Sequence, residues 1–286
     1  MKLAIASGKG GTGKTTVATS LALSLCMQER VTLLDCDVEE PNCHLFLSSE
    51  LKETEAVLVA IPVIDENKCD ACGLCARTCQ YKAIVSLKTK PLLFAEMCHG
   101  CGGCALVCPK GAISNGTREI GRVEHGRANG MHFAYGQLKV GEAMSPPLIR
   151  AVKRHAALHD GICIIDCPPG TACPMVTSVK DTDYILLVTE PTPFGLHDLT
   201  LAIETIRQLH IPFGVVVNRA DIGDCRVREY CVRENIPLLL ELPEDRRIAE
   251  ANSRGGLAIM AVPELKAKFI ELLSRIRGLL STNACA

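Results

Sequence analysis

Short apolar runs alternate along the chain with longer segments in which apolar residues recur at helical spacing. The runs that fit buried strands lie at 2–7, 31–35, 161–166, 184–189, 213–217 and 237–241. The first run is followed by Val17, Leu21 and Leu25, which share one face of a helix. Strands that alternate with helices in this way are typical of a doubly wound, mostly parallel α/β sheet. We predict this fold class for most of the chain.

The segment 264–280 carries a helical apolar stripe. Its apolar positions are Leu265, Phe269, Leu272, Leu273, Ile276 and Leu280. The few basic residues beside them favour a final helix packed on the sheet over a helix bound to a membrane surface. No apolar stretch reaches the roughly 18 residues needed to span a bilayer. We therefore expect no stable membrane anchor.

Composition narrows the classes of partner. The 286 residues allow one large domain and one small domain. Lys and Arg (31) nearly balance Asp and Glu (32), so charge gives no reason to expect a nucleic-acid partner. No signal peptide pattern opens the sequence, and we expect a cytoplasmic protein.

Directly after the first apolar run, residues 8–15 read Gly-Lys-Gly-Gly-Thr-Gly-Lys-Thr and match G-x-x-x-x-G-K-[ST]. The glycines let backbone N–H groups face a phosphate chain at a helix N-terminus. Lys14 would neutralise the β- and γ-phosphates, and the Thr15 hydroxyl would bind Mg²⁺. A coincidental Gly-rich turn is disfavoured by the strand before it and the helix after it. The expected ATP/ADP contacts here are Gly8, Lys9, Gly10, Gly11, Thr12, Gly13, Lys14, Thr15 and Thr16.

Cysteine is the second unusual feature. The chain has 17 cysteines, and eight of them form two runs with the same C-x2-C-x2-C-x3-C spacing. This is the spacing of bacterial ferredoxins, in which the fourth Cys of each run binds the other cluster. We assign Cys69, Cys72, Cys75 and Cys108 to one [4Fe–4S] cluster. Cys98, Cys101, Cys104 and Cys79 are assigned to the second.

Two alternatives to the cluster assignment are disfavoured. Disulfides are unexpected in a chain without a signal peptide. Zinc sites use two or four cysteines with longer spacers. One departure from the ferredoxin pattern is Gln80, which stands where Pro usually follows the fourth cysteine but removes no ligand.

The cysteine runs fall inside the α/β pattern. We predict an inserted small α+β ferredoxin domain at 61–116, within an ATPase domain formed by 1–60 and 117–286. Ile61-Pro62 and Asn115-Gly116 are turn signals and mark the expected boundaries.

The second lysine of the loop, Lys9, makes it resemble the deviant phosphate loop of the MinD/ParA/Mrp and nitrogenase iron-protein ATPases. In that family this lysine reaches the partner's nucleotide, so the resemblance implies a homodimer or a heterodimer with a paralogous ATPase. Leu33-Leu34-Asp35-Cys36-Asp37 resembles switch I, where Asp37 would orient the attacking water. Segment 164–171 resembles the switch II of the Mrp branch, which implies that Asp166 holds the Mg²⁺ shell.

Three later segments extend the resemblance. Asn218, followed by Arg219, ends a strand where the family contacts adenine. Segments 242–245, with Pro243 and Asp245, and 251–255 resemble the MinD segment near the base. The whole is similar to MinD-superfamily P-loop ATPases that carry an inserted ferredoxin domain.

The resemblance implies an ATPase that converts ATP and water to ADP and phosphate, with Lys9, Lys14 and Asp37 as catalytic residues. Two functions fit: a dimer cycle that gates electron transfer to a redox partner, or Mrp-like assembly of iron–sulfur or other metallocofactors on a client protein. A MinD-like spatial organiser is weaker. Mrp-type carriers use a late C-x-x-C, and none follows Cys108, which favours electron transfer.

The remaining metal-binding residue types are less informative. Cys173 lies seven residues after Asp166, the spacing of a ligand in the nitrogenase iron protein, but a second ligand has no counterpart. The pair Cys43-His44 and the pair Cys225 and Cys231 are candidate partner-facing thiols. The other histidines show no metal spacing, and we expect surface or capping roles for them: His125, His132, His155, His159, His197 and His210.

Overall fold

The computed structural model describes residues 1–87, 90–157 and 160–283, so His159 lies outside the described residues. The chain divides into two compact units. The first comprises 1–54, 123–137 and 149–286, and the second comprises 55–122 and 138–148.

The first unit is built on a parallel sheet. Neighbouring strands lie in the order β11-β10-β9-β1-β8-β2-β7, followed by β6 and β3. The strand bounds are β1 Lys2–Ala6, β2 Val31–Asp35, β7 Met131–Leu138, β8 Ile162–Asp166, β9 Tyr184–Thr189, β10 Phe213–Val217 and β11 Leu238–Glu241. Each neighbouring pair among these seven strands is parallel. Each of the six predicted strands is present, and the prediction of a mostly parallel α/β fold is confirmed.

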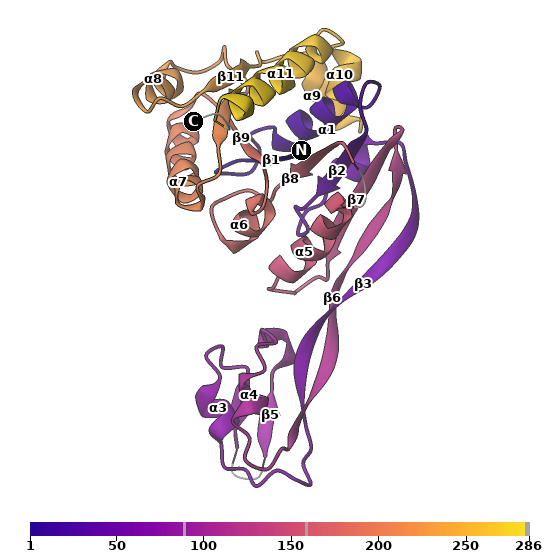
Figure 1. Cartoon of the computed structure of the whole chain (residues 1–286), viewed down its shortest axis with the longest axis vertical. Coiled ribbons are helices and arrows are strands. Elements are labelled where there is room, and N and C mark those ends of the chain that lie inside the picture. Colours follow the sequence, from indigo (N-terminus) through magenta and orange to yellow (C-terminus); the bar gives the residue numbers. More distant parts are fainter. Residues whose placement is uncertain (88–89, 158–159, 284–286) are drawn as a thin grey trace. The chain divides into compact units, whose positions relative to one another are not determined.

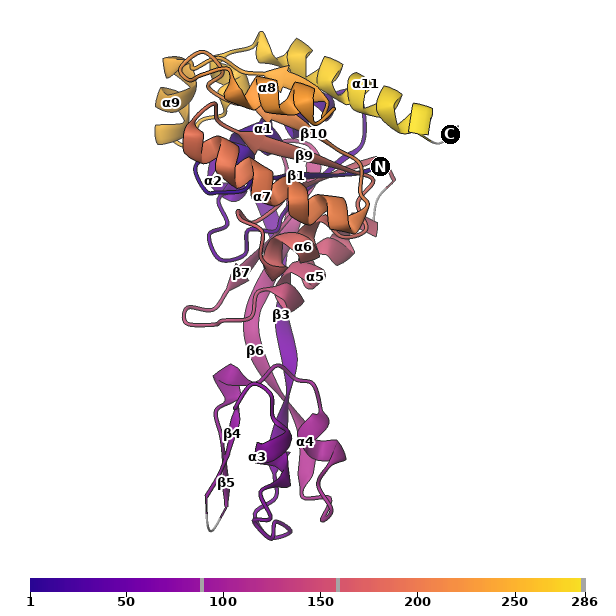
Figure 2. The same ribbon diagram turned by 90° about the vertical axis from the view of Figure 1, so that its left-hand side faces the viewer.

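Helices cover both faces of this sheet, as Figures 1 and 2 show. On one face lie α1 (Lys14–Leu25) and α11 (Leu265–Asn283), and their apolar side chains join one buried core with the strands. On the other face lie α6 (Cys173–Val179) and α7 (Pro193–Leu209). The remaining helices of the unit are α2 (Cys43–Phe46), α8 (Arg226–Arg233), α9 (Arg246–Ser253) and α10 (Ala258–Ala261), with η2 at His155–Ala157.

The final helix packs as its stripe predicts. Leu265, Phe269, Leu272, Leu273 and Ile276 are all buried against the sheet core. Among the described residues, no helix is both long and apolar enough to cross a bilayer.

Within the nine-stranded sheet of the described residues, the strands β3, β6 and β7 were not predicted. β6 (Ile113–Ala128) is long and polar and lacks the apolar run by which a buried strand is recognised. β3 (Ser49–Ile64) begins with the mostly polar segment 49–55 but continues through the apolar run 56–64, so a strand signal was present in the sequence and was missed. Most of the side chains of β3 are exposed. β6 turns into β7 through Asn129-Gly130, whose φ angles are 48° and 84°. Asn-Gly between two strands is the strongest short-range hairpin signal, and it was present in the sequence.

The second unit contains the cysteine runs. It holds the outer parts of β3 and β6, α3 (Leu74–Thr78), η1 (Ala95–Met97), α4 (Gly103–Leu106), and the antiparallel pair β4 (Ile84–Ser86) and β5 (Pro91–Leu93). α5 (Pro146–Arg154) begins in this unit and ends in the first. Ile61-Pro62 and Asn115-Gly116 lie inside β3 and β6 instead of forming turns, and the unit extends beyond 61–116 because these strands continue past both pairs.

The two cysteine runs adopt similar local structures. In each, a glycine in the left-handed region precedes a short helix: Gly73 (φ 74°) before α3 and Gly102 (φ 73°) before α4. A residue with a side chain is strained at such φ angles, so the glycine that follows the second cysteine of each run has a backbone cause.

Burial of the final helix gives a first testable prediction. Ile276→Ala should lower the free energy of unfolding by about 2–5 kcal/mol, because the removed methyl groups leave a cavity in a wholly buried site. Lys268→Ala, on the exposed side of the same helix, is the control and should change it by under about 0.5 kcal/mol. Urea unfolding measures both, and equal effects would contradict the packed helix.

Candidate functional site

The phosphate loop connects the end of β1 to the start of α1. Gly11 and Gly13 have φ angles of 79° and 88°, which favour glycine. A Cβ atom on Gly13 would lie 2.3 Å from Nδ2 of Asn218, and one on Gly8 would lie 2.2 Å from the backbone oxygen of Asp198. Three of the loop's glycines are thus required by backbone conformation or by close packing.

Lys14 opens α1 and is buried beside two carboxylates. Its Nζ lies 2.8 Å from Oδ1 of Asp166 and 3.8 Å from Oδ2 of Asp37. Burial opposes the charged amine, but the charge and hydrogen bond of Asp166 outweigh it and raise the pKa of Lys14 above its usual value. The amine therefore stays cationic in a site that is otherwise acidic.

Asp166 also contacts Thr15, the residue whose hydroxyl is expected to bind Mg²⁺. The Thr15 hydroxyl donates to its Oδ2 at 2.6 Å. A hydroxyl and a carboxylate oxygen are ligands that Mg²⁺ accepts together with water and substrate phosphates. The structure thus brings Thr15 and Asp166 together, and a Mg²⁺ role for them stays a prediction.

Asp35 was quoted in the switch I motif but given no role. It ends β2 directly opposite Asp166 and accepts hydrogen bonds from the backbone N–H groups of Asp37, Asn42 and Cys43. Burial, and then the charge of Asp166, raise the pKa of Asp35 to about 7. The carboxylate fixes the turn that carries Asp37. Burial likewise raises the pKa of Asp37 to about 6, against the opposing effect of Lys14.

Cys43 corrects an expectation. It is wholly buried, with its Sγ 3.5 Å from Oδ2 of Asp166, so the prediction of a partner-facing thiol is wrong. Its backbone N–H is held by Asp35, which turns the start of α2 inward. Cys231 is buried as well, whereas Cys225 and Cys173 are exposed. Cys173 begins α6, and its metal role stays untested.

The residues expected near the base line one cavity with the phosphate loop. Asn218, Arg219, Pro243 and Asp245 all border it, together with Lys14 and Thr15. Asn218 donates from Nδ2 to the backbone oxygen of Thr12 at 2.9 Å. The cavity also has apolar lining residues that were not expected at a nucleotide site from the sequence: Ile248, Leu265 and Phe269. A further lining residue, Asn252, comes from the segment expected near the base and donates to the Thr16 hydroxyl at 3.1 Å.

Lys9 has a partner that sequence reasoning missed. Its Nζ lies 3.7 Å from Oε2 of Glu190, the first residue after β9. Glu190 also pairs with Arg219, at 3.0 Å, and Arg219 pairs with Glu244 at 2.9 Å. Arg219 adopts φ 54°, a conformation that non-glycine residues rarely take. Glu190 thereby links Lys9 to Arg219, which lines the cavity.

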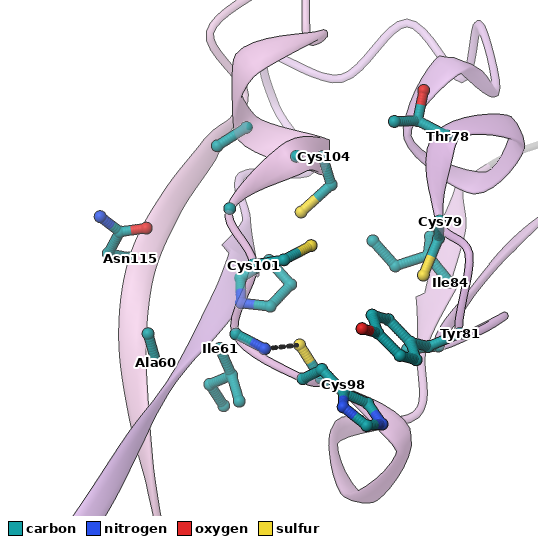
Figure 3. Close-up of a pocket in the computed structure, with 17 residues that line it drawn as sticks. Ala60, Ile61, Thr78, Cys79, Tyr81, Ile84, Cys98, Cys101, Cys104 and Asn115 are labelled. Atoms are coloured by element: carbon teal, nitrogen blue, oxygen red, sulfur yellow. Dashed lines mark hydrogen bonds between the residues drawn. The ribbon is translucent and has the colours of Figure 1, made fainter. Parts of the chain in front are cut away.

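The eight cysteines of the two runs lie around two cavities in the second unit. One cavity, drawn in Figure 3, is lined by Cys79, Cys98, Cys101 and Cys104, whose sulfur atoms point toward a shared space. The other is lined by Cys69, Cys72, Cys75 and Cys108. Each cavity therefore combines three cysteines of one run with the last cysteine of the other.

The donor chemistry of both cavities fits an iron–sulfur cluster. Four thiols border each, and backbone N–H groups already bond two of the sulfurs: Gly100 to Cys98 at 3.5 Å and Ala112 to Cys108 at 3.3 Å. Such bonds to cluster sulfurs help to set the potential. A Cβ atom on Gly100 would lie 2.8 Å from the oxygen of Ala60, so the wall is closely built. The rings of Tyr81 and His99 stack at 3.6 Å beside this wall.

Known proteins resemble the whole chain. "Uncharacterized protein MJ0578" of Methanocaldococcus jannaschii is 35% identical over 276 residues, which cover 94% of this chain and 98% of that one. An iron-sulfur cluster carrier protein of Pyrococcus horikoshii is 24% identical, with coverage of 97% and 88%. Among solved structures, the septum site-determining protein MinD of the same organism, complexed with Mg-ADP, has a TM-score of 0.58 at 20% identity, with coverage of 97% and 96%.

The family described as the CobQ/CobB/MinD/ParA nucleotide binding domain matches residues 3–258. This match includes the phosphate loop and the lining residues of the cavity as far as Asn252. The chain belongs to the CobQ/CobB/MinD/ParA nucleotide binding domain family.

Proposed function

We propose that this protein is an ATP-hydrolysing dimer that carries two [4Fe–4S] clusters and couples its nucleotide cycle to electron transfer to a partner protein. The observation that carries the proposal is the presence of two chemistries in one chain. A phosphate loop faces Asp37 and Asp166, and a second unit gathers eight cysteines as two sets of four.

Nucleotide binding follows from the charges of the loop. Lys14 is buried against Asp166, and a triphosphate offers it a more highly charged partner. When the phosphates bind Lys14, its ion pair with Asp166 is broken. Asp166 and Thr15 are then free to hold Mg²⁺. Asn218, Arg219, Pro243 and Asp245 line the same cavity as the phosphate loop, and they would contact the base. The Mg-ADP complex of the Pyrococcus horikoshii MinD, which shares this fold, supports the assignment.

Hydrolysis needs a positioned water and compensation of charge on the phosphates. Asp37 lies 3.8 Å from Lys14, at the phosphate end of the cavity, and orients the water. Lys9 supplies the second cation, on the phosphates of the partner subunit. In the single chain Lys9 rests on Glu190, so dimer closure exchanges this half-exposed ion pair for a contact with phosphate.

A chain of contacts leads from switch I to a strand that enters the second unit. Asp35 accepts a hydrogen bond from the backbone N–H of Cys43, at the start of α2. The next residue, His44, stacks on Tyr135 with ring centroids 4.6 Å apart. The Tyr135 hydroxyl donates to Glu124 on β6 at 2.9 Å. Movement of switch I on hydrolysis would therefore act on β6. This chain of contacts supports coupling between the nucleotide state and the clusters, which redox titration measures.

The clusters, when bound, supply one-electron carriers. The cysteines hold them, and the backbone N–H groups of Gly100 and Ala112 stabilise the charge on two ligand sulfurs. Tyr81 and His99 are both exposed beside one cavity and offer a contact surface for the redox partner.

A second candidate is assembly of iron–sulfur or other metallocofactors, as in the Mrp branch. The names of relatives favour it, because the Pyrococcus horikoshii protein and a Methanocaldococcus jannaschii protein at 23% identity are named iron-sulfur cluster carrier proteins. Against it, no C-x-x-C follows Cys108 in this sequence. Spatial organisation of the MinD kind is the weakest candidate, because it gives the eight clustered cysteines no role.

The ligand assignment predicts the iron content. Anaerobically purified protein should contain about eight Fe per chain and show a reducible, low-potential EPR signal. Cys79→Ser should perturb the same EPR component as Cys98→Ser and spare the component that Cys72→Ser perturbs. Cys225→Ser, an exposed cysteine outside both runs, is the control. Iron near four per chain, or zinc in its place, would overturn the assignment.

The two loop lysines should fail in different ways. Lys14→Ala should abolish nucleotide binding, because the lost charge faces the β- and γ-phosphates. Lys9→Ala should retain binding but lose ATP-dependent dimerisation and hydrolysis. Lys52→Ala, an exposed lysine of β3, is the matched control. Fluorescent-nucleotide titration, light scattering and phosphate release measure the three properties. Normal ATP hydrolysis by a monomeric Lys9→Ala protein would contradict the role of Lys9 on the phosphates of the partner subunit.

Redox titration tests the coupling itself. If ATP and ADP bind oxidised and reduced protein differently, linkage requires the cluster potential to depend on nucleotide. A typical coupling of about 1–3 kcal/mol corresponds to roughly 40–130 mV for a one-electron centre. Asp37→Ala should trap the ATP-bound dimer and keep the shifted potential. Titrations that superimpose with ATP, with ADP and without nucleotide would reject gating and favour the assembly factor.

A further inference from the structure

Three histidines that are far apart in the sequence meet in the first unit. His125 lies on β6, His132 on β7 and His155 at the start of η2. Their ring centroids are 4.4 Å (His125 to His155), 5.9 Å (His132 to His155) and 6.3 Å (His125 to His132) apart. The expectation of a surface role is wrong for His155, which is buried.

The fold explains the cluster. The two-residue turn at Asn129-Gly130 folds β7 back along β6 and brings positions 125 and 132 near each other. Side chains alternate along β7, so His132 points away from the face on which Phe133 and Tyr135 join the core with α1. His155 comes to that opposite face because it directly follows α5, whose Leu148, Ile149 and Val152 are buried.

The separations suit one metal ion. Imidazole nitrogens bind Zn²⁺ at about 2.0–2.1 Å, which places tetrahedral ligand rings roughly 5 Å apart between centroids. The three observed separations bracket that value. Ring nitrogens of His125 and His155 lie within 4.8 Å of each other. A carboxylate is also at hand, because Oε2 of Glu53, on β3, lies 3.5 Å from Nε2 of His125.

Burial strengthens the case. His155 is 4% exposed, and the side chain of His125 is 12% exposed, whereas Glu53 is largely in solvent. Three clustered imidazoles with one carboxylate at the surface form a set of nitrogen and oxygen donors without thiolate. Such a set suits zinc and related divalent transition metals, and it differs from the all-sulfur sets of the second unit.

We propose that His125, His132 and His155 bind a divalent transition-metal ion of the zinc class, with Glu53 as the fourth ligand. The site is separate from the expected Mg²⁺ site, since His132 pairs with Thr32, three residues before Asp35 at the end of β2. Three residues of strand span about 10 Å. The ion would tie β3, β6, β7 and η2 together, and the proposal does not depend on the proposed function.

The test uses full-length, cluster-loaded protein from which loosely bound zinc has been removed. Co²⁺ is the spectroscopic probe, because its d–d bands report coordination while thiolate ligands add separate charge-transfer bands. Wild-type protein should bind about one Co²⁺ per chain with d–d bands and no new thiolate charge transfer. Zn²⁺ should displace the Co²⁺, and the iron content should stay unchanged. If wild-type protein binds no Co²⁺, or if the bound Co²⁺ shows thiolate charge-transfer bands, the proposal is overturned by this experiment alone.

Variants locate the ion. His132→Gln and His155→Gln should each weaken Zn²⁺ binding at least tenfold, and Glu53→Gln should weaken it less, because its oxygen is exposed. His197→Gln, an exposed histidine of α7, is the matched control and should bind as wild type does. Equilibrium dialysis with metal analysis gives the affinities, and circular dichroism with iron content checks that each variant is folded. Equal affinity in wild type and both ligand variants would place the ion elsewhere and reject the site.

Discussion

The buried ion pair between Lys14 and Asp166 is the contact on which the first unit depends. It joins the phosphate loop to the end of β8, and Thr15 and Cys43 contact the same carboxylate. A buried charge left without its partner is strongly destabilising, whereas the pair itself contributes little net stability. The pair therefore specifies a geometry more than it stabilises the fold. It holds the amine of Lys14 beside the cavity that the phosphate loop lines.

Parallel strands explain why so much of this site could be predicted from the sequence. β1, β2 and β8 are adjacent, and their carboxyl ends meet at one edge of the sheet. A residue placed directly after any of these runs must therefore lie near the others. This argument located Asp37, Asp166 and Lys14, because the local sequence shows where each strand lies and where it ends. The apolar runs that predicted the fold are the runs that form these strands.

The residues that were missed depend on distant parts of the chain. Glu190 lies 181 positions from Lys9, but it directly follows β9, which pairs with β1, so the same argument about strand ends would have placed the two close together. The three histidines are brought together by a hairpin and by the end of α5, so their sequence spacing carried no signal. β3 was missed although residues 56–64 form an apolar run, because the strand begins with polar residues and its pairing with β6 does not show in the sequence.

The exchange of the last cysteine between the two runs bears on how the second unit matures. Because Cys79 and Cys108 each border the cavity formed by the other run, neither set of four thiols is complete until both halves of the unit have come together. Under the proposed ligand sets, the first cluster to be inserted would connect the two cysteine runs. It would thereby bring the four thiols for the second cluster together. Filling of the two cavities would then be cooperative, with chains carrying a single cluster rare at any iron supply.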